Sequence, residues 1–174
     1  MKNTIIALAV AMSFVSGASQ AAGQGSGTVT FTGTVIDAPC SIAPESADQT
    51  IDLGQIALAG LSNATFNGSS TPVPFNIQLN DCTLGTIQTS TTTFAGTAGS
   101  PGMLATSGTA KGISVGLNEG DGTALPVGTE SKAFTLAEGS NTLEFSAYVQ
   151  GNGTLDKPKA GDFTAVATFE MAYQ

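Results

Sequence analysis

Apolar and polar residues alternate with a period of two over most of this chain, which is the pattern of a strand with one buried face. Clusters of Gly, Pro, Asn, Asp and Ser separate the alternating segments, and no segment has a convincing helical period of 3.6 residues. The alternating segments are residues 50–58, 74–82, 87–94, 112–118, 132–136, 141–150 and 162–173. Many short strands with frequent turns predict an all-β sandwich.

One further alternating segment, Gly27 to Cys40, precedes the first cysteine and has no turn signal that would pair it with a neighbouring strand. Its even positions from 28 to 34 are all threonines, and its odd positions are apolar or glycine until a charge follows. The odd positions are Val29, Phe31, Gly33, Val35 and Asp37. The pattern predicts a strand with one face to bury, and the sequence indicates no partner for it.

The last segment has an equally regular apolar face and ends one residue before Gln174. Its odd positions are Ala165, Ala167, Phe169, Met171 and Tyr173. Taken alone, this pattern is also typical of an ordinary core strand that happens to close a sandwich.

The start of the chain is a predicted signal peptide, residues 1–21. Lys2 gives a basic start, Ile5 to Val15 form an apolar run, and Ser19-Gln20-Ala21 fits a cleavage site. The apolar run is too short for a membrane span of roughly 20 residues, so no transmembrane segment is expected. Cleavage after Ala21, uncertain by one residue, leaves about 150 residues, the size of one domain.

Charge and cysteine content limit the possible partners and bonds of the exported chain. The 13 acidic residues outnumber the five basic ones, for a formal net charge of −8, which makes nucleic acid a poor partner. Cys40 and Cys82 are the two cysteines, and in an exported chain they favour a disulfide over a metal site. Such a bridge stabilises by roughly 4 kcal/mol in the chain-entropy model. The alternative is a pair of unrelated buried thiols.

Candidate catalytic chemistry is sparse. The chain has no histidine, which removes the commonest general base and metal ligand. Glu119 and Asp121 are the closest acidic pair, and a glycosidase needs two carboxylates, but the same letters fit a solvated hairpin tip better. No metal or other cofactor is expected. The absence of Trp weakens a sugar-binding interpretation.

Three stretches together resemble the major pilin subunits of chaperone–usher fimbriae, of the type 1 and P pilus kind. "GTVTFTGTVIDAPCSI" is similar to a pilin donor segment running into the first cysteine, and "LNDC" is similar to the strand of the second. "GDFTAVATFEMAYQ" is similar to the C-terminal chaperone-recognition motif, with Gly161 and Tyr173 at its marked positions. The resemblance covers essentially the whole mature chain.

The resemblance implies an incomplete immunoglobulin-like β-sandwich that lacks its final strand and is completed by donor-strand insertion from another subunit. The expected organisation is a signal peptide at 1–21, a donor-strand extension at 22–38 and a pilin domain at 39–174. The implied partners are identical or homologous pilin subunits, a periplasmic chaperone and an outer-membrane usher. The implied location is a fimbria on the cell surface.

The resemblance also implies roles for individual residues. Val29, Phe31 and Val35 would each fill a pocket of a neighbouring subunit, at roughly 1.5–3 kcal/mol per fully buried side chain. Gly33 would leave one pocket unfilled or shallow, although a strand glycine can also mark a bulge or a close backbone approach. Asp37 would mark the end of the groove. Gly161, Ala165, Ala167, Phe169, Met171 and Tyr173 would form the strand that meets chaperone and donor in turn.

Three other functions stay open on the sequence alone. A minor adaptor or tip pilin would share all of these features. A glycan-binding adhesin would normally need an additional lectin domain, for which about 150 residues leave no room. A small secreted enzyme would depend on Glu119 and Asp121.

Overall fold

The computed structural model describes residues 26–154 and 156–174 of the chain. The expected signal peptide at 1–21 and the first residues of the expected extension, 22–25, lie outside this part. The chain divides into two units, residues 1–35 and 36–174, and each is described by itself.

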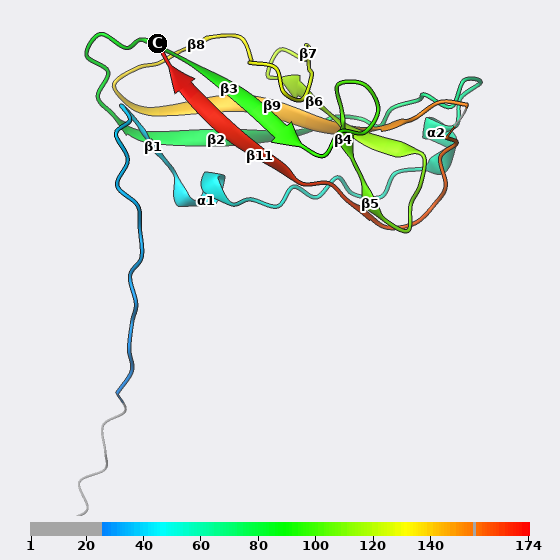
Figure 1. The fold of residues 1–174 in the computed structure, drawn as a ribbon, viewed down its shortest axis with the longest axis horizontal. Coiled ribbons are helices and arrows are strands. Elements are labelled where there is room, and N and C mark those ends of the chain that lie inside the picture. Colours follow the sequence, from blue (N-terminus) through cyan, green and yellow to red (C-terminus); the bar gives the residue numbers. More distant parts are fainter. Residues whose placement is uncertain (1–25, 155) are drawn as a thin grey trace, which may run out of the picture. The chain divides into compact units, whose positions relative to one another are not determined.

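The larger sheet of the second unit has the antiparallel strand order β1-β2-β9-β6-β4, with β7 pairing β6 beside this path. Its strands are β1 (Ser41–Ile42), β2 (Val73–Cys82), β9 (Gly139–Gly151), β6 (Ile113–Glu119), β4 (Leu104–Ala105) and β7 (Ala124–Leu125). The 13-residue β9 is central and is paired on both sides, by β2 and by β6. It runs the length of the sheet (Figure 1).

The smaller sheet has the order β11-β3-β8, and a separate two-stranded pair joins β10 to β5. These strands are β3 (Thr89–Gly96), β5 (Ser107–Gly108), β8 (Phe134–Thr135), β10 (Phe163–Thr164) and β11 (Ala167–Tyr173). The helices of the described residues are single turns, α1 (Pro44–Ala47) and α2 (Leu58–Leu61). None of the described helices is long or apolar enough to cross a membrane.

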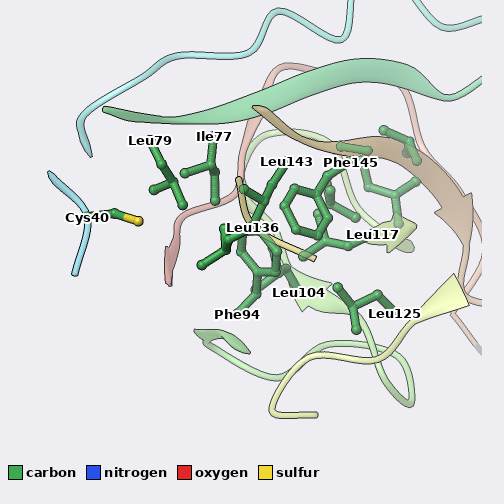
Figure 2. Close-up of a cluster of buried hydrophobic side chains, with 14 of the residues drawn as sticks. Cys40, Ile77, Leu79, Phe94, Leu104, Leu117, Leu125, Leu136, Leu143 and Phe145 are labelled. Carbon is green, nitrogen blue, oxygen red and sulfur yellow. The ribbon is translucent and has the colours of Figure 1, made fainter. Parts of the chain in front are cut away.

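The core lies between the two sheets, and aromatic rings connect them. Phe94 from β3 packs edge-on against Phe145 from β9, with ring centroids 5.1 Å apart, and against Phe75 from β2 at 6.0 Å. Leu79 and Leu143 are also buried in this cluster (Figure 2). Alternate residues of each long strand supply these side chains, so the expected all-β sandwich is confirmed.

Most of the expected strands form with small shifts at their ends. The segments 74–82, 87–94, 112–118 and 141–150 correspond to β2, β3, β6 and β9. The segment 132–136 keeps only the two-residue β8, and the segment 162–173 is divided into β10 and β11.

The strand expected at 50–58 is wrong: no described residue of this segment pairs in a sheet before α2 begins at Leu58. Gly54 has a left-handed φ of 70°, and its N–H group donates a hydrogen bond to Asp52 Oδ1 at 2.8 Å. This local turn interrupts the extended backbone that a ladder needs. The alternation nevertheless reports burial, because Leu53 and Ile56 are half-buried against the core.

Candidate functional site: an unpaired strand edge and an alternating N-terminal segment

Within the part of the chain that the structure describes, strand β11 is paired along one edge only. Its register against β3 runs from Ala167 opposite Gly96 to Tyr173 opposite Ser90, and β3 is its sole partner among the described residues. The other edge of β11 therefore presents backbone N–H and C=O groups to no strand of residues 26–154 or 156–174. Unpaired edges of this kind are templates for pairing with another chain.

The side chains along β11 follow the expected alternation, with one departure. Phe169, Met171 and Tyr173 are half-buried and pack against the core, as does Ala165 just before the strand. Ala167, expected on the same face, is exposed. Val166, at an even position opposite the odd-numbered apolar face, is also exposed, with 72% of its surface accessible.

Phe169 connects this edge to the interior, because its ring lies 6.2 Å from that of Phe94. At the end of the strand, partial burial raises the pKa of the Tyr173 hydroxyl. The Gln174 carbonyl accepts hydrogen bonds from the N–H groups of Gln88 and Thr89, each at 2.9 Å. The end of the strand is thus bonded to the start of β3, while its outer edge pairs with no described strand.

Gly161 lies in a close backbone contact at the approach to β10. A Cβ atom at this position would lie 2.4 Å from Ala110 N and 2.6 Å from the Thr109 carbonyl carbon, which the surrounding backbone cannot accommodate. The neighbouring Asp162 carbonyl accepts hydrogen bonds from the N–H groups of Thr109 and Ala110. The structure thus gives Gly161 a reason to be glycine that lies within its own domain.

The larger sheet also has an edge strand beside apolar side chains. Among the described strands, β1 pairs only with β2. Ile42 from β1, with Leu53 and Ile56 from the segment after it, is half-buried against the same core that β11 covers from the smaller sheet. The sequence indicated Leu53 and Ile56 through alternation, but as members of a strand.

Strand β3, next to β11, carries buried hydroxyl groups that the sequence pattern does not predict. The side-chain oxygens of Ser90, Thr91 and Thr92 are buried and have no hydrogen-bond partner in the described part of the chain. Ser90 and Thr92 are fully buried. The alternation of 87–94 predicts one buried face, whereas three consecutive residues, Ser90 to Thr92, are buried, which a period of two does not predict.

The N-terminal segment, residues 26–36, is exposed and unpaired within the described part of the chain, unlike β11 and β3. Residues 26–36 form no strand or helix. Val29, Phe31 and Val35 are 74%, 90% and 101% exposed, so the whole apolar face is open to solvent. A Cβ atom at Gly33 would meet open space. This segment's own packing therefore supplies no bulge or close backbone approach that would require glycine there.

The expected disulfide is present. Cys40, immediately before β1, is bonded to Cys82 at the end of β2, with the Cα atoms 4.1 Å apart. Both cysteines are buried. Asp37 is exposed in the bend that leads to Cys40. The bridge fixes the start of the folded domain directly after the alternating segment.

Glu119 and Asp121 form part of an ion-paired hairpin rather than an open pair of carboxylates. Both contact Lys132 Nζ, Glu119 at 3.1 Å and Asp121 at 2.5 Å. The hydrogen bond from Lys132, followed by the one from the Thr123 N–H, holds the pKa of Asp121 below its ordinary value. The hydrogen bonds to Asp121 and Glu119 raise the pKa of Lys132. The arrangement ties the β6–β7 turn to the segment before β8.

A disulfide-bridged β-sandwich with an unpaired edge strand, preceded by an exposed alternating segment, has the architecture of a structural fimbrial subunit. The fimbrial protein family model matches residues 29–174, so the chain belongs to this family. It is 48% identical to the Fimbria A protein of Serratia marcescens, with all of both chains covered. It is 42% identical to the Major MR/P fimbria protein of Proteus mirabilis, over 97% of this chain and 96% of that protein.

Solved structures agree with this assignment. The subunit fold in the structure of a chaperone–usher pilus matches with a TM-score of 0.75 and 35% identity, over 87% of this chain and 97% of that one. The P pilus rod subunit PapA matches with a TM-score of 0.68 and 31% identity, over 79% of this chain and 100% of that one. The chain is a structural pilin of a surface fimbria, with an incomplete immunoglobulin-like sandwich that is completed by donor-strand exchange.

Proposed function

We propose that residues 22–38 are the donor extension of this pilin and that their apolar face lies along the open edge of β11 in a neighbouring subunit. One observation carries the proposal: the described residues include an alternating face that is fully exposed, and a strand edge that pairs with no other described strand and lies beside half-buried apolar side chains. Adding a strand to such an edge gives affinity through backbone hydrogen bonds and specificity through alternate side chains.

The energetics favour insertion. Burial of Val29, Phe31 and Val35 supplies on the order of 5–9 kcal/mol before the cost of ordering the segment. Each subunit gives a strand to one neighbour and accepts one from the other, so the contact is heterologous and generates an open filament. On the acceptor side, Phe169 and Met171 contribute the half-buried surface that the donor covers.

Gly33 is proposed to match a shallow position of the acceptor. Its surroundings impose no need for glycine in this segment. A larger polar side chain would then meet a position with no room and leave a polar group unpaired, at a cost of about 1–3 kcal/mol. Asp37 ends the apolar face, and we assign it to the end of the acceptor groove.

The unassembled edge needs a transient partner, which we propose is a periplasmic chaperone that hands the subunit to an outer-membrane usher. An uncovered strand edge with apolar side chains promotes aggregation. The residues assigned to this contact are Gly161, Ala165, Ala167, Phe169, Met171 and Tyr173. The exposure of Ala167 and the packing role of Gly161 make these two the weakest members of the set.

We assign no catalytic function to the acidic pair. Glu119 and Asp121 are engaged by Lys132 and hold a hairpin in place, which supports a structural role. The relatives named above as Fimbria A protein and Major MR/P fimbria protein match over nearly their whole length, which supports a main subunit of the fibre over an adaptor or tip subunit.

The test compares Gly33→Asn with Thr32→Asn in fibre assembly from purified subunits, read as heat-resistant ladders on a gel. Both changes introduce the same side chain one residue apart, but only position 33 is on the face assigned to the acceptor. Gly33→Asn should strongly reduce the ladder, and Thr32→Asn should leave it close to wild type. Equal ladders for both variants would contradict the assignment of this face.

A further inference from the structure

Three of the lysines gather at one end of the domain. Lys111 and Lys159 face each other in an antiparallel bridge, exchanging backbone hydrogen bonds of 3.3 and 2.9 Å. Lys157 lies two residues away, with Nζ 4.7 Å from the centre of the Phe66 ring. All three are exposed, and none has a carboxylate within ion-pair distance in the described residues, where the ion pairs belong to Lys132. We call these three lysines the lysine end.

The opposite end carries carboxylates and no described lysine. Asp81 precedes Cys82 of the disulfide, and Asp37 precedes its partner Cys40 by three residues. Glu138 adjoins Gly139, which is paired with Cys82, and its Oε1 accepts a hydrogen bond from the Leu84 N–H at 3.2 Å. We call Asp37, Asp81 and Glu138 the acidic end. All three are exposed.

Strand β9 separates the two ends. It begins at Gly139 beside the acidic end and finishes at Gly151, which pairs with Ile113 close to Lys111. Thirteen residues of extended strand span roughly 40 Å. Figure 1 shows β1 and the C-terminal end of β11 at one end of the sandwich, and α2 at the other. Asp156 and Asp162 also lie near the lysines, so the lysine end is only slightly positive overall.

Strand β11 runs from the lysine end toward the acidic end. The segment that leads into it starts near the lysine end, where the Asp162 carbonyl accepts hydrogen bonds from the N–H groups of Thr109 and Ala110, next to Lys111. It finishes near the acidic end, where Gln174 is bonded to Gln88, and the Leu136 N–H donates in turn to the Gln88 carbonyl, two residues from Glu138.

Resting on the proposed donor exchange, we infer that the lysine end of one subunit docks against the acidic end of the next copy. The donor segment leads directly into Asp37 and the disulfide, so the donor's acidic end lies wherever its inserted strand finishes. A donor antiparallel to β11 finishes at the acceptor's lysine end, and this brings opposite charges together. A parallel donor would finish at the acceptor's acidic end and oppose like charges, which is costly. The charges thus act as a second determinant of subunit polarity.

The test is zero-length carbodiimide cross-linking of assembled fibres, which joins lysine amines to carboxylates in direct contact, followed by mass spectrometry of the digested product. Amide bonds between the lysine end and the acidic end are expected in fibres and not in monomers. Because the ends lie roughly 40 Å apart within one domain, such a bond must join two copies. The bond between Lys132 and Glu119, 3.1 Å apart, is the internal control and should form in both samples.

Charge exchange gives an independent measurement. The pair Lys157→Glu and Lys159→Glu should slow assembly by about tenfold at low salt, because the steering between the ends becomes repulsive. Adding Asp81→Lys and Glu138→Lys to the same chain should restore the rate. The difference should disappear near 1 M salt, where charges are screened within about 3 Å. Glu130→Lys, an exposed acidic residue assigned to neither end, is the matched control and should leave the rate unchanged.

The outcomes separate this inference from the proposed donor exchange. Heat-resistant ladders without cross-links between the two ends, or without rescue by charge exchange, would overturn end docking and leave donor exchange standing. Wild-type subunits that form no ladder at all would overturn donor exchange, and end docking with it.

Discussion

The segment 27–35 and the strand β11 have the same sequence pattern and opposite structures. Both alternate regularly between an apolar face and a second face. β11 finds β3 along one edge and packs Phe169 against the core, whereas residues 27–35 form no strand and expose Phe31. Alternation therefore reports that a face is to be buried, and the availability of a ladder partner decides whether a strand forms within the chain.

The segment 50–58 is intermediate in behaviour between β11, which is paired and packed, and residues 27–35, which are neither. It alternates, it packs Leu53 and Ile56 against the core, and it still forms no ladder because of the turn at Gly54. Burial of side chains and pairing of the backbone are separate requirements. β11 satisfies both on one edge, 50–58 satisfies the first only, and 27–35 satisfies neither without a partner.

The largest effect on the folded domain should come from its disulfide. Replacing Cys40 and Cys82 together with Ala should lower the free energy of unfolding by about 4 kcal/mol, because the denatured chain regains the freedom of the closed loop. Urea unfolding of the isolated subunit measures this. If the double variant unfolded at the wild-type midpoint, the bridge would not anchor the domain where the alternating segment ends.

Two phenylalanine truncations compare the regions directly. Phe169→Ala should lower the free energy of unfolding by about 2 kcal/mol, below the full value for a buried ring because Phe169 is half-buried. Phe31→Ala should leave that free energy within about 0.5 kcal/mol of wild type, since the ring touches solvent in the subunit.

Fibre assembly should respond to Phe31 although subunit stability does not. Phe31→Ala should reduce fibre formation, because the donor segment loses an apolar side chain, and should leave the free energy of unfolding of the subunit unchanged. A destabilised Phe31→Ala subunit with intact assembly would show that the segment belongs to its own domain's core.

A smaller effect, of opposite sign, is expected at the core side of β3. Thr92→Val replaces a fully buried hydroxyl that lacks a described partner with a methyl group of similar size. The free energy of unfolding should rise by about 1 kcal/mol, and Thr93→Val, at a position that is only partly buried, should change it less. Destabilisation by Thr92→Val would mean that the hydroxyl makes a bond that residues 26–154 and 156–174 do not show.

The smallest effect should come from the hairpin ion pairs, because Lys132 and Asp121 are exposed and Glu119 alone is partly buried. Lys132→Met should lower the melting temperature slightly. Asp121 has a lowered pKa, so its contribution is present above the ordinary value of 3.8 and is lost as the pH falls through the folded value. Lys132 has a raised pKa, so its contribution is present below 10.5 and is lost as the pH rises through the folded value.

Thermal melts at several pH values therefore test this pair. The difference in melting temperature between wild type and Lys132→Met should be constant from roughly pH 5 to pH 9. It should shrink in strong acid, where Asp121 becomes protonated. A difference that changed across the neutral range would indicate another titrating group.

The sequence sufficed for the features that depend on local pattern. It placed the strands around Ile77 and Leu143, the Cys40–Cys82 bridge, and the parity of Phe169 and Met171 correctly. Each of these follows from residue type and spacing. For the cysteines, the predicted export of the chain favours a disulfide over free thiols.

The features it could not supply depend on which strands become neighbours. Thr92 is buried where β3 lies between Met171 of β11 and Ser131 of the segment before β8, with which its backbone exchanges hydrogen bonds. The contact of Lys132 with Glu119 joins residues 13 apart in the chain across a turn that periodicity does not describe. Ala167 is exposed although Ala165 and Phe169, on the same face, are half-buried, and a period of two does not predict this break.

The central claim is that β11 is completed by residues 27–35 of another copy, and amide hydrogen exchange tests it most directly. Protection at β11 should rise by orders of magnitude when subunits assemble into fibres, while β9, already paired on both sides, should change little and serve as the control. Subunits that lack residues 26–35 should fold but fail to confer this protection. Equal protection of β11 in isolated subunits and in fibres would contradict the account.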